Sequence, residues 1–350
     1  MMRNLVRMTK VLVYCCALAL LGVSGTANAD GGRAPLNPGK KVLAFYYTWY
    51  LTPEASGKWE HWNEGKHNPD KILENGFRDI GTTDHPVGGT YDSSEPALIR
   101  RHLELAQYCG IDALIATWWG PNNYIDTGLG KVLDEIEKTN SPVRVCAYYE
   151  IVSEPTVQGV MKDIEYAVSK YGVRPGYFKV DGRPVIFVTG LTLKQLGLEG
   201  WQEVTRIARD RKIVLLPDKS SEKWVSAFDG MHLYNPYDGP IVDRDLRQDY
   251  VKHVELARRL GIIATATVAP GCNDSNIGRP QDTVVGRRDG NLYREMWEGA
   301  IQSKPDWILI TSFNEWHEGT EIEPSIEYGK KYIEMTKEYA TTFKSSQQPD

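Results

Sequence analysis

Eight short apolar segments, separated by amphipathic helical patterns, constrain the fold of this chain more than any other feature. Each segment has the length of a buried strand, and each pattern between them repeats its apolar positions with the period of a helix. Strands that alternate with helices predict parallel pairing through right-handed crossovers. The segments are Val42–Tyr50, Asp112–Trp119, Val143–Glu150, Pro184–Gly190, Lys212–Asp218, Gly230–Asn235, Ile262–Ala269 and Trp307–Phe313.

Eight strand–helix repeats in a chain of 350 residues predict an α/β fold, a single TIM-type (β/α)8 barrel with long loops at its C-terminal face. The alternative is an open doubly wound sheet, which calls for a glycine-rich phosphate turn after the first strand. The sequence there reads Tyr50-Leu51-Thr52-Pro53, so the barrel is favoured. Two segments, Leu51–Ser94 and Gly271–Gly290, are long for barrel loops, and such loops are usually functional.

The N-terminus has the features of a secretory signal peptide. Three basic residues precede the apolar run Val11–Val23, and Ala27-Asn28-Ala29 supplies a cleavage site. The apolar run is shorter than the roughly 20 residues that a membrane span needs. We therefore expect residues 1–29 to be removed and residues 30–350 to form one catalytic barrel domain, secreted or periplasmic, with no membrane attachment.

Charge and cysteine content narrow the class of protein further. The formal net charge of −5 argues against nucleic acid and anionic membranes as partners. Cys109, Cys146 and Cys272 follow the signal segment, and their spacing matches no zinc site or disulfide framework, so at most one bridge is expected. Cys109 and Cys146 adjoin or lie in predicted strands, which favours buried packing. We expect a monomer without metal or cofactor.

Aromatic and polar side chains gather where the predicted strands end, for example at Tyr46–Tyr50, at Trp118-Trp119 and at Glu150. The C-terminal ends of barrel strands carry the active site in this fold. Sugar rings have apolar C–H faces and hydroxyl edges, so aromatic faces beside hydrogen-bonding groups suit a carbohydrate. Packing at the rim is the competing interpretation for any single aromatic residue.

Two carboxylates, Glu315 and Glu318, follow the eighth segment directly in the sequence Ser-Phe-Asn-Glu-Trp-His-Glu-Gly. Carboxyl groups this close repel one another when both are ionised, so one tends to keep a proton while the other is charged. That pairing predicts acid–base catalysis, against the competing interpretation of a solvated turn. His317 lies between the two and is expected to orient them.

Two other hydrolase chemistries fit the sequence poorly. His317 to Glu321 has the form H-E-x-x-E and lacks the second histidine of a zinc protease, while Gly319 and Pro324 oppose a continuous helix there. No G-x-S-x-G motif is present, which argues against a serine nucleophile.

The chain resembles glycoside hydrolase family 99 and the wider family 99-like and family 71-like proteins. The similarity begins at the motifs Phe45–Tyr50 and Lys58-Trp59-x-His61-Trp62 and ends in the highly specific block Thr311–Glu323. Its weaker parts are His85-Pro86, Tyr91-Asp92-Ser93, Trp118-Trp119 and Glu150. Members of this family are (β/α)8 barrels, and characterised ones act as endo-α-mannosidases or endo-α-mannanases. The chain departs from the family at Gly271-Cys272, where Pro-Gly-Tyr is usual, and between Thr117 and Tyr124.

The resemblance implies unequal roles for the two glutamates. Glu315 would take the proton of the substrate 2-hydroxyl, which attacks the anomeric carbon to give a 1,2-anhydro sugar. Glu318 would protonate the leaving oxygen and then activate water. We expect an exported enzyme that hydrolyses an α-linked, mannose-containing oligo- or polysaccharide and retains the configuration of the anomeric carbon. The alternatives are an inverting glycosidase on another glycan and a non-catalytic carbohydrate-binding barrel.

The strand-end pattern and the resemblance together predict a set of substrate-binding residues around this catalytic pair. None of them is predicted to bind a metal. The set comprises Tyr46, Trp49, Tyr50, Trp59, His61, Trp62, His85, Trp118, Trp119, Glu150, Tyr234, Asn314, Trp316 and His317.

Overall fold

A ring of parallel strands forms the centre of the computed structural model, which describes residues 35–237 and 246–346. The predicted signal peptide lies outside these residues. Strand β1 pairs with β2 on one side and β10 on the other, and every pairing around the ring is parallel. In ring order from β10 the strands are β10 (Trp307–Ile310), β1 (Lys41–Tyr46), β2 (Ala113–Trp118), β3 (Arg144–Tyr149), β5 (Arg183–Val188) and β6 (Val214–Pro217), and β7 (Thr265–Val268) pairs with the other edge of β10.

The gap between β6 and β7 is filled by the sixth predicted strand, which the structure shows only as isolated parallel bridges. Asp218 pairs with His232, and Gly230 pairs with Ile263. The backbone N–H of His232 donates to the Pro217 carbonyl at 3.0 Å, which supports the first bridge. The prediction of a continuous strand over Gly230–Asn235 was therefore wrong, because this segment forms only isolated bridges, but its position between the neighbouring strands was right. All eight predicted segments contribute to a (β/α)8 barrel.

Large rings fill the barrel interior. The ring centroids of Phe45 and Phe187 lie 6.3 Å apart, His232 lies 5.1 Å from Phe187, and Trp307 lies 6.2 Å from Phe187. Burial lowers the pKa of His232 to about 3, so its imidazole is neutral at physiological pH. The barrel is a packed core, and any binding site must lie at its mouth.

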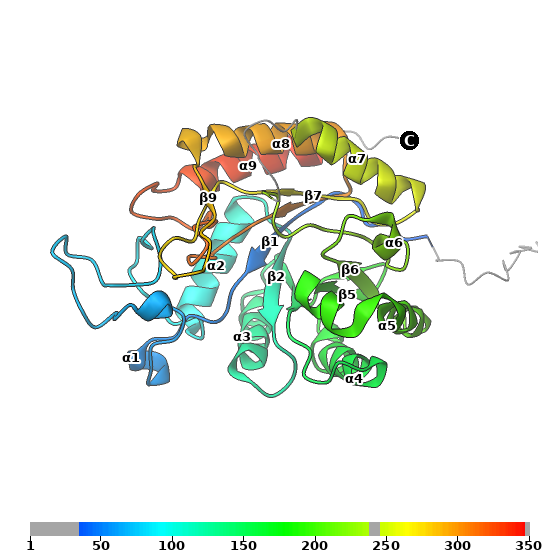
Figure 1. Cartoon of the computed structure of the whole chain (residues 1–350), viewed down its shortest axis with the longest axis horizontal. Helices are drawn as coiled ribbons and strands as arrows, with labels where there is room; N and C mark the ends of the chain where they lie inside the picture. The colour runs from blue at the N-terminus through cyan, green and yellow to red at the C-terminus, as the bar shows by residue number, and fades with distance from the viewer. Residues whose placement is uncertain (1–34, 238–245, 347–350) are drawn as a thin grey trace, which may run out of the picture. The chain divides into compact units, whose positions relative to one another are not determined.

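Amphipathic helices surround the strands, with α7, α8 and α9 on one side of the view and α3, α4 and α5 on another (Figure 1). In α3 (Tyr124–Thr139), Ile125, Leu129 and Val132 are buried with helical spacing, and the Asn123 side chain caps the N-terminus by accepting from the Asp126 N–H. The other long helices are α2 (Pro96–Tyr108), α4 (Val157–Ala167), α5 (Gly190–Asp210), α7 (Leu246–Arg259), α8 (Asn291–Ser303) and α9 (Lys331–Ser345). The short elements are α1 (Pro53–Ser56), α6 (Glu222–Val225), β4 (Lys179–Val180), β8 (Cys272–Asn273) and β9 (Val284–Val285).

The two long loops after β1 and β7 contact each other. The Asn276 side chain donates to the Thr82 carbonyl at 2.7 Å, and His67 Nε2 donates to the Asn276 carbonyl at 2.9 Å. Gly65 has a φ of +65°, and a Cβ there would lie 2.4 Å from the Asn276 carbonyl oxygen. A side chain at position 65 would clash with the Asn276 carbonyl, so the two loops can pack this closely only because residue 65 is glycine.

The three cysteines Cys109, Cys146 and Cys272 are free and buried, and none forms a disulfide. The packing role predicted for Cys109 and Cys146 is thus confirmed. Within residues 35–237 and 246–346, the helices are too short or too polar to cross a membrane.

Candidate active site

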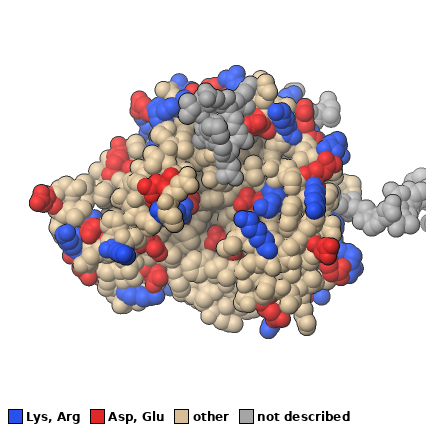
Figure 2. All heavy atoms as spheres, viewed as in Figure 1, with Lys and Arg blue, Asp and Glu red and all other residues tan. Residues whose placement is uncertain are grey.

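A cavity of ≈ 430 Å³ is formed by residues that follow the strands of the ring. Most of its lining residues come directly after the carboxyl end of a strand, where parallel strands place their loops together. Figure 2 shows charged side chains of both signs around a hollow on one face. The cavity is lined by Tyr47, Trp49, Tyr148, Glu150, Thr189, Gly190, Leu191, Lys194, Asp218, Lys219, Tyr234, Arg279, Glu315, His317 and Glu318.

The turn that carries the two glutamates is held by hydrogen bonds from several directions. The Glu315 N–H donates to the Ser312 hydroxyl at 2.7 Å. The Asn314 side chain accepts from the Tyr47 N–H at 2.8 Å and donates to the Tyr47 carbonyl at 2.9 Å, which ties the turn to the end of β1. The Trp316 N–H donates to the Tyr50 hydroxyl at 3.0 Å. These bonds hold the turn in place around Glu315.

Glu315 lies in the deeper and drier position of the pair. It is 2 % exposed, and its Oε2 atom has no hydrogen-bond partner among the described residues. Its Oε1 atom accepts from the Tyr50 hydroxyl at 3.5 Å, a long contact. Burial raises the pKa of Glu315 well above its usual range, and the nearby Glu318 and Glu150 raise it further. The protonated form of Glu315 is favoured in this structure.

Glu318 lies in a wetter and more polar position. Its carboxylate forms an ion pair with Arg279 at 3.0 Å and accepts from the Tyr234 hydroxyl at 2.9 Å. Arg279 is itself held by the buried Asp274 at 2.8 Å, and the Tyr47 hydroxyl donates to that of Tyr234 at 2.8 Å. The two glutamates thus have different surroundings, as an acid and a base acting together require.

A third carboxyl group, Glu150, faces the same cavity from the end of β3. Its Oε2 atom accepts from the Thr117 hydroxyl at 2.5 Å and from the Trp119 indole N–H at 2.8 Å. Burial raises the pKa of Glu150 to about 7, against the lowering effect of these two donors. This carboxyl group therefore changes charge near neutral pH.

Trp49, His61 and His317 form an aromatic wall beside the pair. Trp49 stacks on His61 with ring centroids 4.5 Å apart and lies 5.9 Å from His317. The Nε2 atom of His317 hydrogen-bonds to the His61 carbonyl. Burial lowers the pKa of His317 to about 3, so it is neutral and orients the turn without adding charge. An apolar ring face next to carboxylates suits a sugar ring.

Ten residues of the predicted substrate-binding set do not line the cavity, and six of them have their polar atoms bonded elsewhere in the protein. Successive strand residues point to opposite faces, so Tyr47 and Trp119 face the mouth while their neighbours Tyr46 and Trp118 pack toward the helices. Their polar atoms have internal partners: Tyr46 with His102, Trp118 with Asp126, Trp62 with the Tyr91 carbonyl, Trp316 with Tyr91 and Glu323, Trp59 with Asp70, and His85 with Glu327.

The remaining predicted residues lie at the cavity or directly behind it. Trp49, Glu150, Tyr234 and His317 line it with the two glutamates. A second group does not line the cavity but contacts residues that do, and it comprises Tyr50, His61, Trp119 and Asn314.

Several cavity residues were not selected from the sequence. Tyr47 and Tyr148 lie in the aromatic ends of predicted strands, and Asp218 ends the fifth apolar segment. Their position at the carboxyl end of a strand is therefore a sequence signal for all three. Arg279 lies within a loop already identified as long. Lys194 lies inside a helix and carries no sequence signal of this role.

Behind the turn, a buried cation supports the residues that follow Glu318. Arg287 forms ion pairs with Glu321 and, at 3.3 Å, with Asp84. It also donates to the Gly319 carbonyl at 3.0 Å and to the Glu321 carbonyl at 2.9 Å. This network fixes the chain immediately after the second glutamate.

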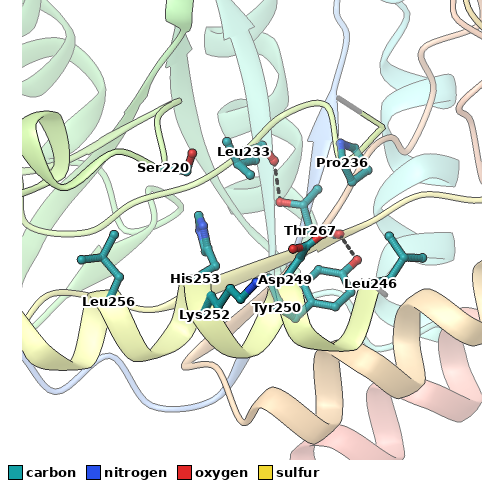
Figure 3. Close-up of a pocket in the computed structure, with 11 residues that line it drawn as sticks. Ser220, Leu233, Pro236, Leu246, Asp249, Tyr250, Lys252, His253, Leu256 and Thr267 are labelled. Carbon is teal, nitrogen blue, oxygen red and sulfur yellow. Dashed lines mark hydrogen bonds between the residues drawn. The ribbon is translucent and has the colours of Figure 1, made fainter. Parts of the chain in front are cut away.

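A second cavity, of ≈ 290 Å³, lies between α7 and the barrel (Figure 3). The Tyr250 hydroxyl donates to the Thr267 carbonyl at 2.6 Å, and the Thr267 hydroxyl donates to the Leu233 carbonyl at 2.5 Å. These bonds link its own walls, and none of the predicted site residues lines it. In the described part of the chain, no cluster of three or more His, Cys, Asp or Glu side chains is arranged to hold a metal ion.

A (β/α)8 barrel with paired, unequally placed carboxyl groups at its mouth defines a class, the retaining or inverting glycoside hydrolases. The sequence model of glycosyl hydrolase family 99 matches residues 37–340. The chain therefore belongs to glycosyl hydrolase family 99, and it is a glycoside hydrolase.

Relatives and solved structures agree with this family. The glycoprotein endo-alpha-1,2-mannosidase of Rattus norvegicus is 28 % identical over 324 residues, which cover 81 % of this chain and 68 % of the rat protein. The Xenopus laevis enzyme of the same name is 26 % identical over 83 % of this chain and 71 % of its own length. The structure of the GH99 endo-alpha-mannosidase from Bacteroides thetaiotaomicron superposes with a TM-score of 0.74 at 26 % identity, covering 89 % of this chain and 100 % of that one.

Proposed function

We propose that this protein is an exported endo-acting α-mannosidase that cleaves its glycan with retention through Glu315 and Glu318. The observation that carries the proposal is the pair itself: two carboxyl groups on one turn, in one cavity, with different burial and different partners. The relatives named endo-alpha-1,2-mannosidase support mannose as the sugar. The aromatic wall supports a pyranose ring beside the pair.

In the proposed first step, Glu315 accepts the proton of the sugar 2-hydroxyl while that oxygen forms a bond to the anomeric carbon. The bond from the anomeric carbon to the leaving oxygen breaks, and Glu318 supplies its proton to that oxygen. In the second step Glu318 takes a proton from water, whose oxygen attacks the anomeric carbon. The 2-oxygen then leaves and recovers its proton from Glu315, which restores both carboxyl groups.

These roles require a particular protonation state of each glutamate when the glycosidic bond breaks. Burial and nearby carboxyl groups favour the protonated form of Glu315, whereas the proposed mechanism needs Glu315 ionised and Glu318 protonated when the glycosidic bond breaks. Substrate binding must therefore change the balance within the pair. A carboxylate with a raised pKa is the stronger base once it is ionised, so the burial of Glu315 suits the removal of a hydroxyl proton.

The test combines product stereochemistry with two variants. Incubating the protein with α-mannans and following the first product by proton NMR is expected to show the α-anomer. Glu315→Gln and Glu318→Gln are each expected to lower kcat/KM by roughly 10²–10⁴-fold. Because an activated leaving group needs no proton, Glu318→Gln is expected to lose far less activity on an α-mannosyl-mannosyl fluoride, while Glu315→Gln stays impaired.

Three outcomes would contradict parts of this proposal. The β-anomer as first product indicates the inverting alternative, in which the base activates water. Recovery of Glu315→Gln on the fluoride, in place of Glu318→Gln, would reverse the two roles. Sugar binding without turnover, unaffected by either variant, indicates a carbohydrate-binding barrel.

Export is tested separately. The predicted signal peptide supports it, and we expect the mature protein, recovered from the periplasm or the medium, to begin near Asp30. A cell-associated protein that keeps its original N-terminus would contradict export.

A further inference from the structure

Two lysines line the cavity on the side away from the glutamate pair. Lys194 belongs to α5, which follows β5, and Lys219 comes just after β6. In the ring of eight, β5 stands directly across from β10, whose following turn carries Glu315 and Glu318, and β6 is next to β5. These lysines are therefore placed to contact a part of the glycan beyond the bond that is cleaved.

Among the described residues, neither lysine forms an ion pair, although Lys219 is close enough to Asp218 to interact with its charge. In residues 35–237 and 246–346, neither ammonium group has a carboxylate oxygen within the 4.0 Å of an ion pair. Arg279, the third cation of the cavity, differs because it pairs with both Glu318 and Asp274.

Asp218 also lines this end of the cavity, and its carboxylate accepts the Tyr234 N–H at 3.1 Å. Burial raises the pKa of Asp218 against the lowering effect of Lys219, which weakens its negative charge. Lys194 and Lys219 thus bring two positive charges to this wall, opposed among the described lining residues there by the partly neutralised Asp218.

The start of α5 brings backbone to the same end of the cavity. Gly190 opens α5, and a Cβ at this position would lie 3.3 Å from Asp218 Oδ2 and 3.5 Å from Lys219 Nζ. Asp218 and Lys219 therefore both lie next to Gly190 at this wall. Thr189, Gly190 and Leu191, at the start of α5, line the same wall.

We propose that this end of the cavity binds a negatively charged group, a phosphate or a carboxylate, carried by a sugar next to the cleaved bond. The inference rests on the proposed function, because the same cavity holds the glutamate pair. A lysine ammonium donates three hydrogen bonds and accepts none, whereas sugar hydroxyls both donate and accept. Two lysines beside one buried carboxyl group of raised pKa therefore suit an anion better than a neutral sugar.

The experiment compares matched oligosaccharides that differ only in charge: a neutral α-mannooligosaccharide, its phosphorylated counterpart and a counterpart bearing a uronic acid. Binding is measured by calorimetry on the mature protein carrying Glu315→Gln to prevent turnover. We expect at least one charged ligand to bind about tenfold more tightly than the neutral one, as two partly exposed charge contacts would give. Comparing the two charged ligands distinguishes phosphate from carboxylate.

The variants test the assignment to these residues. Lys194→Ala/Lys219→Ala is expected to abolish the preference, because it lowers affinity for the charged ligands about tenfold more than affinity for the neutral ligand. Lys223→Ala, an exposed lysine of α6 that does not line the cavity, is the matched control and is expected to keep the preference. Added salt is expected to weaken only the charged ligands.

Equal affinity for neutral and charged ligands, or a preference that survives the double variant, overturns the inference. Hydrolysis of neutral α-mannans by the wild-type protein is assayed in parallel. Turnover of these mannans without charge preference refutes only the lysine subsite. A charge preference in binding without turnover of any α-mannoside refutes only the proposed activity.

Discussion

The two sides of the cavity differ in how firmly their side chains are held. On the side of β10 and β1, Glu315 and Asn314 are buried and the turn is bonded to Tyr47, Tyr50 and Ser312. On the side of β5 and β6, Leu191 is 60 % exposed and Lys194 is exposed. Proton transfer needs atoms fixed to within fractions of an ångström, whereas recognition of a sugar substituent tolerates movement. The difference indicates that proton transfer takes place on the side of β10 and β1, and that the side of β5 and β6 recognises substituents of the substrate.

Arg287→Met should cause the largest loss of stability, on the firmly held side of the cavity. It leaves the Glu321 and Asp84 carboxyl groups without their cation in the interior, and we expect the free energy of unfolding to fall by about 3–5 kcal/mol. Urea denaturation followed by tryptophan fluorescence measures the loss. The neighbouring Arg288→Met removes an exposed ion pair with Glu295 and is expected to cost less than about 1 kcal/mol. Equal losses in the two variants would show that the buried Arg287 network stabilises the firmly held side no more than an exposed ion pair does.

Glu150→Gln tests the carboxyl group that lies between the two sides. Its pKa is raised in the folded protein, so the folded state binds the proton more strongly than the unfolded state does. The stability of the wild type relative to this variant should therefore fall as pH rises from about 4.5 to about 7, by roughly 1–3 kcal/mol. Chemical denaturation across this pH range checks it, with exposed Glu199→Gln as control. A parallel pH dependence in wild type and Glu150→Gln would contradict the assignment.

Leu191→Ser should have the smallest effect, on the open side. Because Leu191 is exposed, we expect its replacement to change the free energy of unfolding by less than about 0.5 kcal/mol. Leu193→Ser, two residues along the same helix and fully buried, is expected to cost about 3 kcal/mol or more. Both are measured by the same denaturation series. A large loss in Leu191→Ser would show that the open side is as firmly packed as the other.

The sequence predicted the barrel well because its signals are local. Apolar segments such as Val143–Glu150 and amphipathic patterns such as that of α3 determine strand and helix without reference to distant residues. The sixth strand was predicted too regular, because its pairing with Asp218 and Ile263 depends on neighbours far away in sequence. Too many aromatic residues were assigned to the site, because alternation along a strand sends Tyr46 outward to His102 of α2 and Tyr47 to the cavity.

By itself, the sequence determined the repeating architecture, the family resemblance and the position of Glu315 and Glu318 after the last barrel strand. Only the tertiary structure decided how the two differ, because burial, the Arg279 ion pair and the nearness of Glu150 arise from segments far apart in the chain. The same holds for Lys194 and Lys219, which come to one cavity wall through neighbouring strands. Electrostatic surroundings depend on distance in space, and a sequence records only distance along the chain.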